Sequence, residues 1–421
     1  MARKLRELPA TLKIHVDYYD AEQKKKLLAA GAPPLSAEPL VLSIDTPELA
    51  AFYMYRNLRS GVPGFSTHAD IVAQAEDALV HWNGHVAVHN DSLQLLQVKD
   101  TDKGVTEHIG EAVGLAVISQ LNGLHAADWT RIAITSRHKT LDFRQSHAAS
   151  TGTRLIELET KGAAVIDNSR TDLVTAAKAS IDEKKSDGRN RVSATALRYG
   201  TIAALDARPD GIARCWLVDP PTETDEDPKR FKIVARMGFI ANVVSTVGAR
   251  SSFAAALQTR MAALSAMPDV TQLSGIPLIG GAGEPFADSW ASGPPHPWFA
   301  FRSTTQSGRR GGQVYYAGER RLLFLGLDMK LLGIAAGQDF EQLLNYSLAP
   351  ISVDSYVNCV VPLGRFSLEF AQQFEIPRGA ATTSGGYVRF KAHGRVLLSK
   401  SGLVLGGLSV PEEWKLKGTS E

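Results

Sequence analysis

The hydrophobic and polar positions follow two different periods along the chain, and these periods predict its elements. In the first hundred residues the pattern predicts strands at Leu12–Tyr18 and Leu40–Ile44, helices at Pro47–Leu58 and Asp70–Trp82, and a hairpin turning at Asn90-Asp91. Residues 1–105 are therefore expected to form an N-terminal α+β region.

A new pattern begins at Thr106. Glu107–Leu121 is apolar almost all round, which indicates a buried helix. The pattern then predicts three strands, an amphipathic helix and two more strands, at Arg131–Thr135, Thr140–Phe143, Thr153–Thr160, Thr171–Lys185, Thr201–Ala207 and Ile212–Val218. This succession over residues 106–221 is typical of an α/β domain of ordinary size.

The acidic, proline-bounded segment Asp219–Pro228 is expected to be a linker. Phe231–Leu264 beyond it is helix-like. The strand candidates that follow are Val314–Tyr316, Leu322–Leu327, Val357–Val361, Tyr387–Lys391 and Val396–Ser399. Residues 230–421 are therefore expected to form a strand-rich C-terminal domain, which makes three domains in all.

Composition narrows the class of protein. Hydrophobic residues make up 44% of the chain and charged residues 21%, so the chain can bury cores and is not disordered. The densest apolar run, Ala112–Leu121, is about half as long as a membrane span, and the N-terminal residues lack the apolar segment of a signal peptide. The two isolated cysteines, Cys215 and Cys359, exclude a disulfide framework and a structural zinc site. We therefore expect a cytoplasmic protein with no membrane partner.

The net charge of +2 is unevenly distributed. Residues 1–105 carry 11 Lys/Arg and 13 Asp/Glu, residues 106–221 carry 15 and 14, and residues 230–421 carry 19 and 13. A basic excess of this kind is expected of a protein that binds nucleic acid, although an excess of six over such a length is also ordinary.

Two arginine pairs in the basic region are candidates for nucleic-acid contacts. They are Arg309, Arg310, Arg320 and Arg321. Tyr315 and Tyr316 lie between them, so the arginines could hold phosphates while the rings stack on bases. The alternative is that all of them belong to a solvated hairpin.

Candidate chemistry is concentrated in the strand predicted at Thr153–Thr160 and the residues just after it. The strand period of two places Glu157, Glu159 and Lys161 on one face and turns Ile156 and Leu158 to a core on the other. Charges on a buried strand cost free energy unless they pair or bind a ligand. On the preceding strand candidate stands Asp142, which an adjacent strand can bring beside Glu159.

The succession of Asp142 and Glu159-x-Lys161-Gly162 resembles the active site of the PD-(D/E)xK superfamily of restriction-endonuclease-like nucleases, with Leu141 in place of the motif's proline. The resemblance covers residues 106–221. It implies an α/β restriction-endonuclease-like core, here flanked by the α+β N-terminal region and the strand-rich C-terminal domain. It also implies a Mg²⁺ (or Mn²⁺) ion held by Asp142 and Glu159. Lys161 would orient or deprotonate the attacking water, and Glu111, in the opening helix, would supply a further acid.

Phosphodiester hydrolysis explains these residue types. The reaction needs a water in line with phosphorus and stabilisation of the charge that develops on oxygen. Clustered carboxylates repel one another and so attract a hard cation with oxygen ligands. Such a cation polarises the phosphate and acidifies its bound water.

Plainer interpretations of the same residues remain open. Glu157, Glu159 and Lys161 could form a surface row of salt bridges, and Glu111 could simply favour the start of its helix. A second constellation, Asp91, Gln97 and Lys99 with Glu76, mimics the Q-x-K variant of the same superfamily.

Two functions follow as expectations. The first is a metal-dependent nuclease, acting on DNA by preference, which the resemblance associates with defence against foreign DNA. The second is a non-catalytic nucleic-acid-binding or assembly subunit that keeps the fold and works with partner subunits or as a homo-oligomer.

Overall fold

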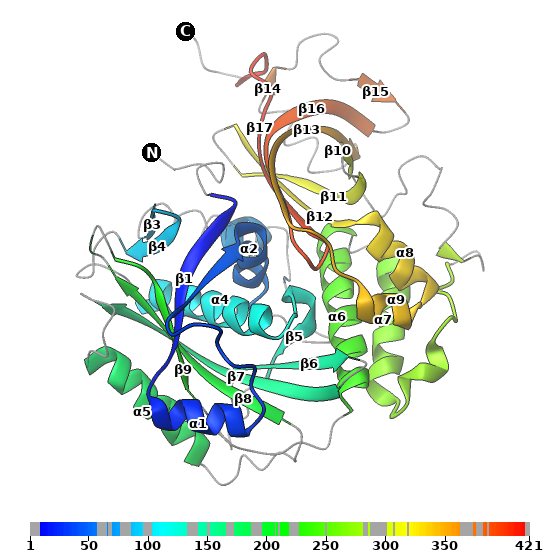
Figure 1. Cartoon of the computed structure of the whole chain (residues 1–421). Coiled ribbons are helices and arrows are strands. Elements are labelled where there is room, and N and C mark those ends of the chain that lie inside the picture. Colours follow the sequence, from blue (N-terminus) through cyan, green and yellow to red (C-terminus); the bar gives the residue numbers. More distant parts are fainter. Residues whose placement is uncertain are drawn as a thin grey trace. The chain divides into compact units, whose positions relative to one another are not determined.

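The computed structural model describes residues 9–56, 65, 70–75, 86–95, 103–132, 142–149, 152–165, 172–186, 196–206, 208, 211–218, 227–248, 251–280, 285–286, 301–305, 308–317, 320–362, 374–375, 382–384 and 387–416. The chain divides into two compact units (Figure 1). Unit 1 comprises Met1–Arg3, Leu8–Val62 and Asp77–Phe239; unit 2 comprises Lys4–Glu7, Pro63–Glu76 and Ile240–Glu421. The domain boundary expected near residue 105 therefore falls inside unit 1.

The described strands of unit 1 form a nine-stranded mixed sheet in the order β3-β4-β1-β9-β8-β7-β6-β5, with β2 paired to β1. Their bounds are β1 Thr11–Tyr18, β2 Leu40–Asp45, β3 Val86–His89, β4 Ser92–Leu95, β5 Trp129–Arg131, β6 Phe143–Ala149, β7 Gly152–Val165, β8 Ala196–Asp206 and β9 Arg214–Val218. β7 is antiparallel to β6 and parallel to β8, and β1 is parallel to β9. Strands from both sides of residue 105 thus share one sheet.

The helices of unit 1 are α1 Ala21–Ala29, α2 Thr46–Tyr55, α4 Lys103–Leu121, α5 Asp172–Ser186, the short 3-10 helix η2 Ala126–Asp128 and the first half of α6 Pro228–Gly248. Short-range sequence features explain where some of these helices and strands begin or end. Asp20 caps α1 by accepting a hydrogen bond from the backbone N–H of Gln23 at 2.8 Å. Asn90 and Asp91 take φ values of 50° and 62° at the predicted hairpin turn between β3 and β4.

α4 and α5 pack on opposite faces of β7 and β8 (Figure 1). α4 crosses so closely that a Cβ on Gly162 would lie 1.7 Å from the carbonyl oxygen of Thr106, and one on Gly110 would lie 2.5 Å from the Cα of Gly162. Only glycine permits this backbone contact. On the other face, Val174 and Ile181 of α5 pack into a buried apolar cluster.

Most of the predicted α/β succession is confirmed: α4, β7, α5, β8 and β9 follow in the expected order. The strand expected at Thr140–Phe143 differs, because β6 begins at Phe143 and Asp142 directly precedes it. The strand expected at Arg131–Thr135 ends at Arg131 as β5, and residues 133–141 lie outside the described residues.

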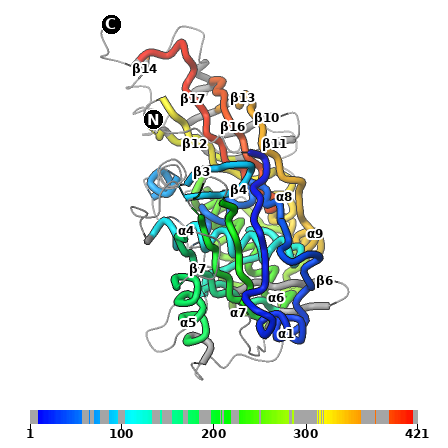
Figure 2. Tube along the Cα trace, turned by 60° about the vertical axis from the view of Figure 1, so that its left-hand side comes forward, coloured from blue at the N-terminus to red at the C-terminus, as the bar shows by residue number. Residues whose placement is uncertain are grey.

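The strands of unit 2 form an antiparallel sheet in the order β10-β11-β12-β17-β16-β13, with β15 paired to β16 and with a separate β14–β18 pair. Their bounds are β10 Phe301–Thr305, β11 Gly308–Tyr316, β12 Arg321–Asp328, β13 Ile351–Pro362, β14 Phe374–Glu375, β15 Thr382–Ser384, β16 Tyr387–Leu398, β17 Leu403–Ser409 and β18 Lys415–Leu416. β13, β16 and β17 run side by side in both views (Figures 1 and 2). β10 and β13, the two ends of this order, also lie against each other, so the sheet curls.

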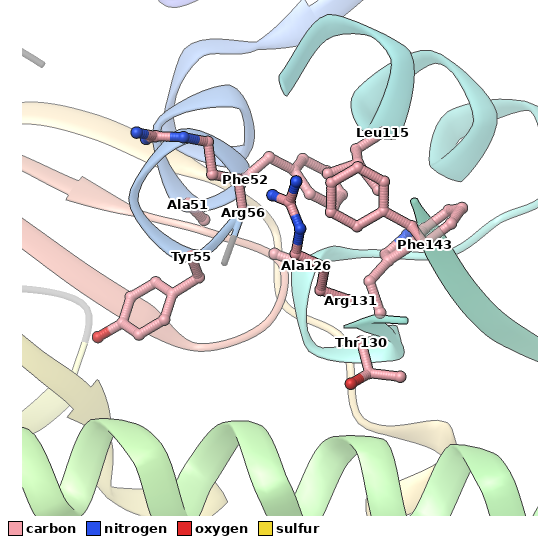
Figure 3. A pocket seen from close by; sticks show the side chains of 10 residues that line it. Ala51, Phe52, Tyr55, Arg56, Leu115, Ala126, Thr130, Arg131 and Phe143 are labelled. Atoms are coloured by element: carbon pink, nitrogen blue, oxygen red, sulfur yellow. The ribbon is translucent and has the colours of Figure 1, made fainter. Parts of the chain in front are cut away.

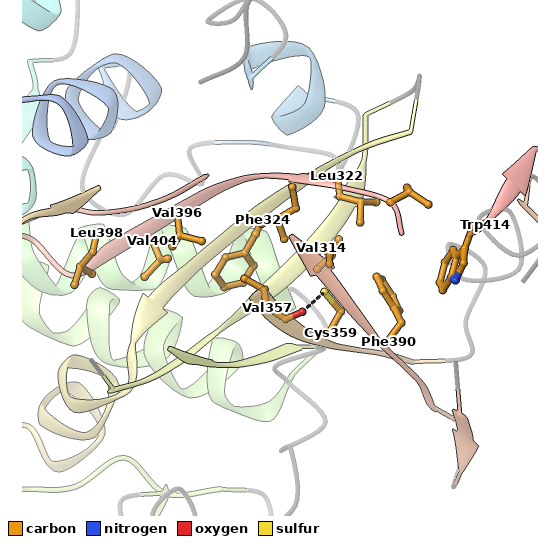
Figure 4. Close-up of a cluster of buried hydrophobic side chains, with 13 residues drawn as sticks. Val314, Leu322, Phe324, Val357, Cys359, Phe390, Val396, Leu398, Val404 and Trp414 are labelled. Atoms are coloured by element: carbon orange, nitrogen blue, oxygen red, sulfur yellow. Dashed lines mark hydrogen bonds between the residues drawn. The ribbon is translucent and has the colours of Figure 1, made fainter. Parts of the chain in front are cut away.

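The inner face of this curled sheet holds the core of unit 2 (Figure 4). Its buried side chains include Val314, Phe324, Val357, Cys359, Phe390, Val396, Val404 and Trp414. The helices of unit 2 are α7 Ser252–Ala266, η3 Val270–Leu273, α8 Met329–Gly337, α9 Phe340–Asn345 and the second half of α6. The expected strand-rich C-terminal part is thus present, with helices added.

Among the described residues, one helix is long and apolar enough to cross a membrane by length and composition alone. It is α6, and 78% of its most apolar window is buried. The apolar pattern of the sequence pointed to Ala112–Leu121 as the densest apolar run, and not to α6. A helix buried to this extent is typical of a protein core.

Candidate functional site

β7 is buried on both faces, not on one. Leu155 packs with Phe231 and Ala235 of α6, although it shares the face predicted for the charges. Glu157 is 2% exposed and forms an ion pair of 2.6 Å, Oε2 to Nε, with Arg198 of β8, directly opposite in the register. The surface row of salt bridges is therefore wrong for Glu157, which is a paired charge inside the protein.

Glu159 and Lys161 form the second ion pair on β7. Glu159 is fully buried, and its Oε1 lies 2.6 Å from the Nζ of Lys161, whose side chain is 29% exposed. Burial alone would lower the pKa of Lys161. The carboxylates of Glu159, Asp142 and Glu107 outweigh burial and raise that pKa. Lys161 is therefore a firmly held ammonium group in this arrangement, suited to stabilising negative charge.

Asp142 lies at the edge of β7, next to this pair. Its backbone N–H donates to the carbonyl of Leu158 at 3.1 Å. Its Oδ2 accepts hydrogen bonds from the backbone N–H and the hydroxyl of Thr160, at 3.0 and 3.3 Å. The carboxylate is thus fixed beside Thr160, the residue between Glu159 and Lys161.

Glu111 reaches the same neighbourhood from α4, but it is held by arginines. Its Oε1 lies 3.2 Å from Nη2 of Arg131 and its Oε2 lies 3.7 Å from Nε of Arg56. Burial is the main cause that raises the pKa of Glu111 to about 7. The charges of Asp142 and Glu107 add to this rise, and the two guanidinium groups oppose it.

The residues predicted for the nuclease motif are connected through charge: Asp142 and Glu159 both interact with Lys161, and Asp142 also interacts with Glu111. The charge of Glu107, which the sequence analysis missed although it stands one helical turn before Glu111, acts on Glu111 and Lys161 as well. Within the part of the chain that the structure describes, no three His, Cys, Asp or Glu side chains are grouped as metal ligands. The pair Asp142 and Glu159 would thus have to be completed by water and substrate oxygens.

A small pocket opens beside Glu111's two arginines (Figure 3). It is lined by Ala51, Phe52, Tyr55, Arg56, Leu115, Ala126, Trp129, Thr130, Arg131 and Phe143. Its volume of about 10 Å³ suffices for a single water molecule. Arg131 lies over the ring of Phe143, 5.5 Å from its centroid. The pocket therefore has room for a water molecule beside Arg56 and Arg131.

A second buried cluster, which the sequence did not suggest, ties α6 to η2 in unit 1. Arg236 hydrogen-bonds both oxygens of Asp128 and the Nε2 of His125, the last at 2.8 Å. Burial would raise the pKa of Asp128, but the positive charges of Arg236 and its neighbours lower it well below its usual range. The cluster is saturated with partners, which indicates a structural role.

The predicted nucleic-acid contacts lie in unit 2. Arg309 and Arg310 belong to β11, and their side chains lie outside the described residues. Arg320 donates to the backbone carbonyls of Pro411, Glu412 and Trp414. Arg321 donates to the carbonyl of Ala317 at 3.4 Å. Arg320 and Arg321 thus stabilise the local backbone, and their part in nucleic-acid binding stays a prediction.

The structure also bears on Tyr315 and on the rival Q-x-K constellation. Tyr315 is 1% exposed and its hydroxyl donates to the carbonyl of Thr246 at 3.2 Å, so its ring cannot stack on a base. In the rival Q-x-K constellation, Asp91 lies in the β3–β4 turn and pairs with Lys13 at 3.3 Å. Its other members, Glu76, Gln97 and Lys99, lie outside the described residues.

Comparisons with protein-family models, with curated proteins and with solved structures found no match to this chain.

Proposed function

We propose that this protein is a metal-dependent nuclease that hydrolyses phosphodiester bonds, preferably in DNA, with unit 1 as its catalytic part. The observation that carries the proposal is the order α4-β5-β6-β7-α5-β8, in which β5, β6 and β7 are antiparallel and β8 is parallel to β7. This order is the one expected of a restriction-endonuclease-like core. It supports the proposal because it brings the carboxylate of Asp142, ahead of β6, to Thr160 of β7, where its charge acts on Lys161, the partner of Glu159.

The donor set fits a hard divalent cation. Asp142 and Glu159 offer carboxylate oxygens, and Mg²⁺ is commonly held by one or two carboxylates together with waters and substrate phosphates. When bound, Mg²⁺ or Mn²⁺ polarises the phosphate and acidifies a water molecule. Glu159 must turn from Lys161 to become a ligand, which leaves the ammonium group of Lys161 free to face the phosphate.

Lys161 then acts as the group that stabilises charge in the transition state. The raised pKa keeps the proton on Nζ while Lys161 is paired with Glu159. In the proposed mechanism Lys161 keeps this proton after Glu159 turns to the metal, because the substrate phosphate replaces the carboxylate as its anionic partner, so Lys161 is not the base that deprotonates the water. Glu111 takes the role of a buried carboxyl group that holds Arg131 and Arg56 in place, and it is not needed as a metal ligand. Both assignments refine the roles that the sequence resemblance implied.

The test is a cleavage assay with the purified full chain, using plasmid DNA and an RNA transcript with and without Mg²⁺ or Mn²⁺. Cleavage of DNA should require the metal and should fall by about two orders of magnitude or more in Asp142→Asn and Glu159→Gln. Lys178→Met, which removes a lysine paired with Asp182 on α5, is the matched control and should cleave like the wild type. Metal-dependent cleavage that survives in both carboxylate variants would place the active site elsewhere.

A second candidate is a non-catalytic nucleic-acid-binding or assembly subunit. It is favoured by the direct 2.6 Å pairing of Glu159 with Lys161 and by the lack of a three-ligand group among the described side chains. Titration with Mn²⁺ separates the two. A nuclease should bind the ion at one site that Asp142→Ala and Glu159→Ala abolish, whereas a scaffold should bind none there. Defence against foreign DNA is the role we propose for the nuclease.

A further inference from the structure

One outer face of the unit 2 sheet carries an exposed aromatic ring among cations. Tyr356 of β13 is 63% exposed, whereas its neighbours Val357 and Cys359 contribute to the buried core. On the paired strand β16, Lys391 and His393 are exposed and Ala392 between them is buried. The period of two thus separates an apolar inner face from a basic, aromatic outer face.

The exposed side chains are arranged around the ring of Tyr356. His393 is directly opposite Tyr356 in the register, with ring centroids 4.6 Å apart at an angle of 52°. The Nζ of Lys391 lies over the ring, 5.8 Å from its centroid. Arg395 follows two residues after His393 and pairs with Asp354 at 3.7 Å. Lys391 and His393 therefore border a single exposed ring, and Arg395 continues the row of basic residues at alternate positions of the strand.

On β11 and β12 of the same sheet, helices cover the outer face. Tyr315 of β11 is buried, and its hydroxyl donates to the carbonyl of Thr246 in the second half of α6. α8 packs on β11 and β12. Tyr356 is instead 63% exposed, although its ring contacts His393 and Lys391 of the neighbouring strand.

Charge and ring together select one class of partner. Cations attract a polyanion, and an exposed ring gives an unpaired base a face on which to stack, worth about 1–3 kcal/mol per base. Duplex bases are already stacked on one another and cannot use this ring. An acidic peptide would engage the cations but would leave the ring unexplained.

We propose that Tyr356, Lys391, His393 and Arg395 form a binding face for single-stranded nucleic acid, with a base on Tyr356 and phosphates on the basic side chains. This face differs from the residues that the arginine pairs of the sequence suggested. It goes beyond the proposed nuclease activity, because binding here requires neither Asp142 nor a metal ion.

The test measures binding of a fluorescent oligothymidylate to the full chain in EDTA, where no metal-dependent cleavage takes place. Tyr356→Ala should weaken binding about tenfold or more, and Tyr356→Phe, which keeps the ring, should restore it. Lys391→Ala should reduce the slope of log Kd against log salt by about 0.7. Lys330→Ala removes an exposed lysine from α8 and serves as the matched control, with binding unchanged.

Oligothymidylate binding that Tyr356→Ala leaves intact would overturn the proposal, as would equal affinity for a duplex of the same length. Binding of a poly-glutamate peptide that is lost in Tyr356→Ala, without any loss for oligothymidylate, would assign the face to an acidic protein. Because the assay contains EDTA, none of these outcomes depends on whether unit 1 cleaves DNA.

Discussion

Unit 1 and unit 2 are both built on sheets, but the sheets differ in where they carry ionisable side chains. β7 of unit 1 carries them inside the protein, whereas β16 of unit 2 carries them on the face exposed to solvent. β7 of unit 1 carries Glu157 and Glu159 inside the protein, at 2% and 0% exposure. β16 of unit 2 carries Lys391 and His393 at similar alternate positions, yet both face solvent. Buried charges require partners and are costly to keep, whereas charges on an outer face are not. The burial of Glu159 therefore fits the catalytic role that we propose for β7.

The largest expected effect comes from breaking the buried ion pair of β7. Arg198→Ala leaves the carboxylate of Glu157 uncompensated inside the sheet, so the free energy of unfolding should fall by about 3–5 kcal/mol. Urea denaturation followed by circular dichroism measures it. The double variant Glu157→Gln/Arg198→Met should recover much of the loss, since no unpaired charge then remains.

The matched change in unit 2 is Arg395→Ala, which breaks the partly exposed pair with Asp354. This pair should contribute at most about 1 kcal/mol, because water screens it. If Arg198→Ala and Arg395→Ala had equal effects on unfolding, the contrast between buried and outer charges would not hold.

A somewhat smaller effect is expected from the proton on Glu111. Burial raises its pKa from 4.5 to about 7 in the folded protein, so the folded state binds this proton more tightly than the unfolded chain. The bound proton contributes on the order of 3 kcal/mol to the free energy of unfolding. This contribution is complete below pH 4.5 and is lost as the pH rises through 7.

Glu111→Gln removes this titration. The free energy of unfolding of the wild type, measured relative to Glu111→Gln, should therefore fall between pH 5 and pH 8. A relative stability that rises over the same range would mean that the two arginines outweigh burial and that Glu111 is an ordinary ion-paired carboxylate.

The sequence predicted those parts of the fold that depend on local patterns. The charges of β7 and the helices α4 and α5 could be located because strand and helix periods are properties of neighbouring residues. The parallel pairing of β1 with β9 joins residues about two hundred positions apart, and no local pattern announces it. For that reason the boundary expected near residue 105 could not be judged from the sequence.

The residues of the candidate site were likewise predicted from the sequence only in part. Asp142, Glu159 and Lys161 were selected from their spacing; Glu159 and Lys161 lie on β7, and Asp142 directly precedes β6. Arg56 and Arg131 were missed, because only tertiary packing brings them to Glu111.

The strand that carries the basic outer face was predicted in two pieces. Tyr387–Lys391 and Val396–Ser399 were expected as separate strands, whereas β16 runs from Tyr387 to Leu398 without interruption. A Cβ at Gly394 would lie 2.1 Å from the carbonyl oxygen of Gly407, so glycine is needed there for close strand packing.

The most direct test of the central claim is the cleavage rate of Lys161→Met, measured together with its Mn²⁺ affinity. Lys161 is assigned to charge stabilisation and not to ligation, so metal affinity should equal or exceed that of the wild type, because Glu159 loses its ion-pair partner. Metal-dependent cleavage of plasmid DNA should fall about 10²- to 10⁴-fold. Cleavage by Lys161→Met at the wild-type rate would contradict the account.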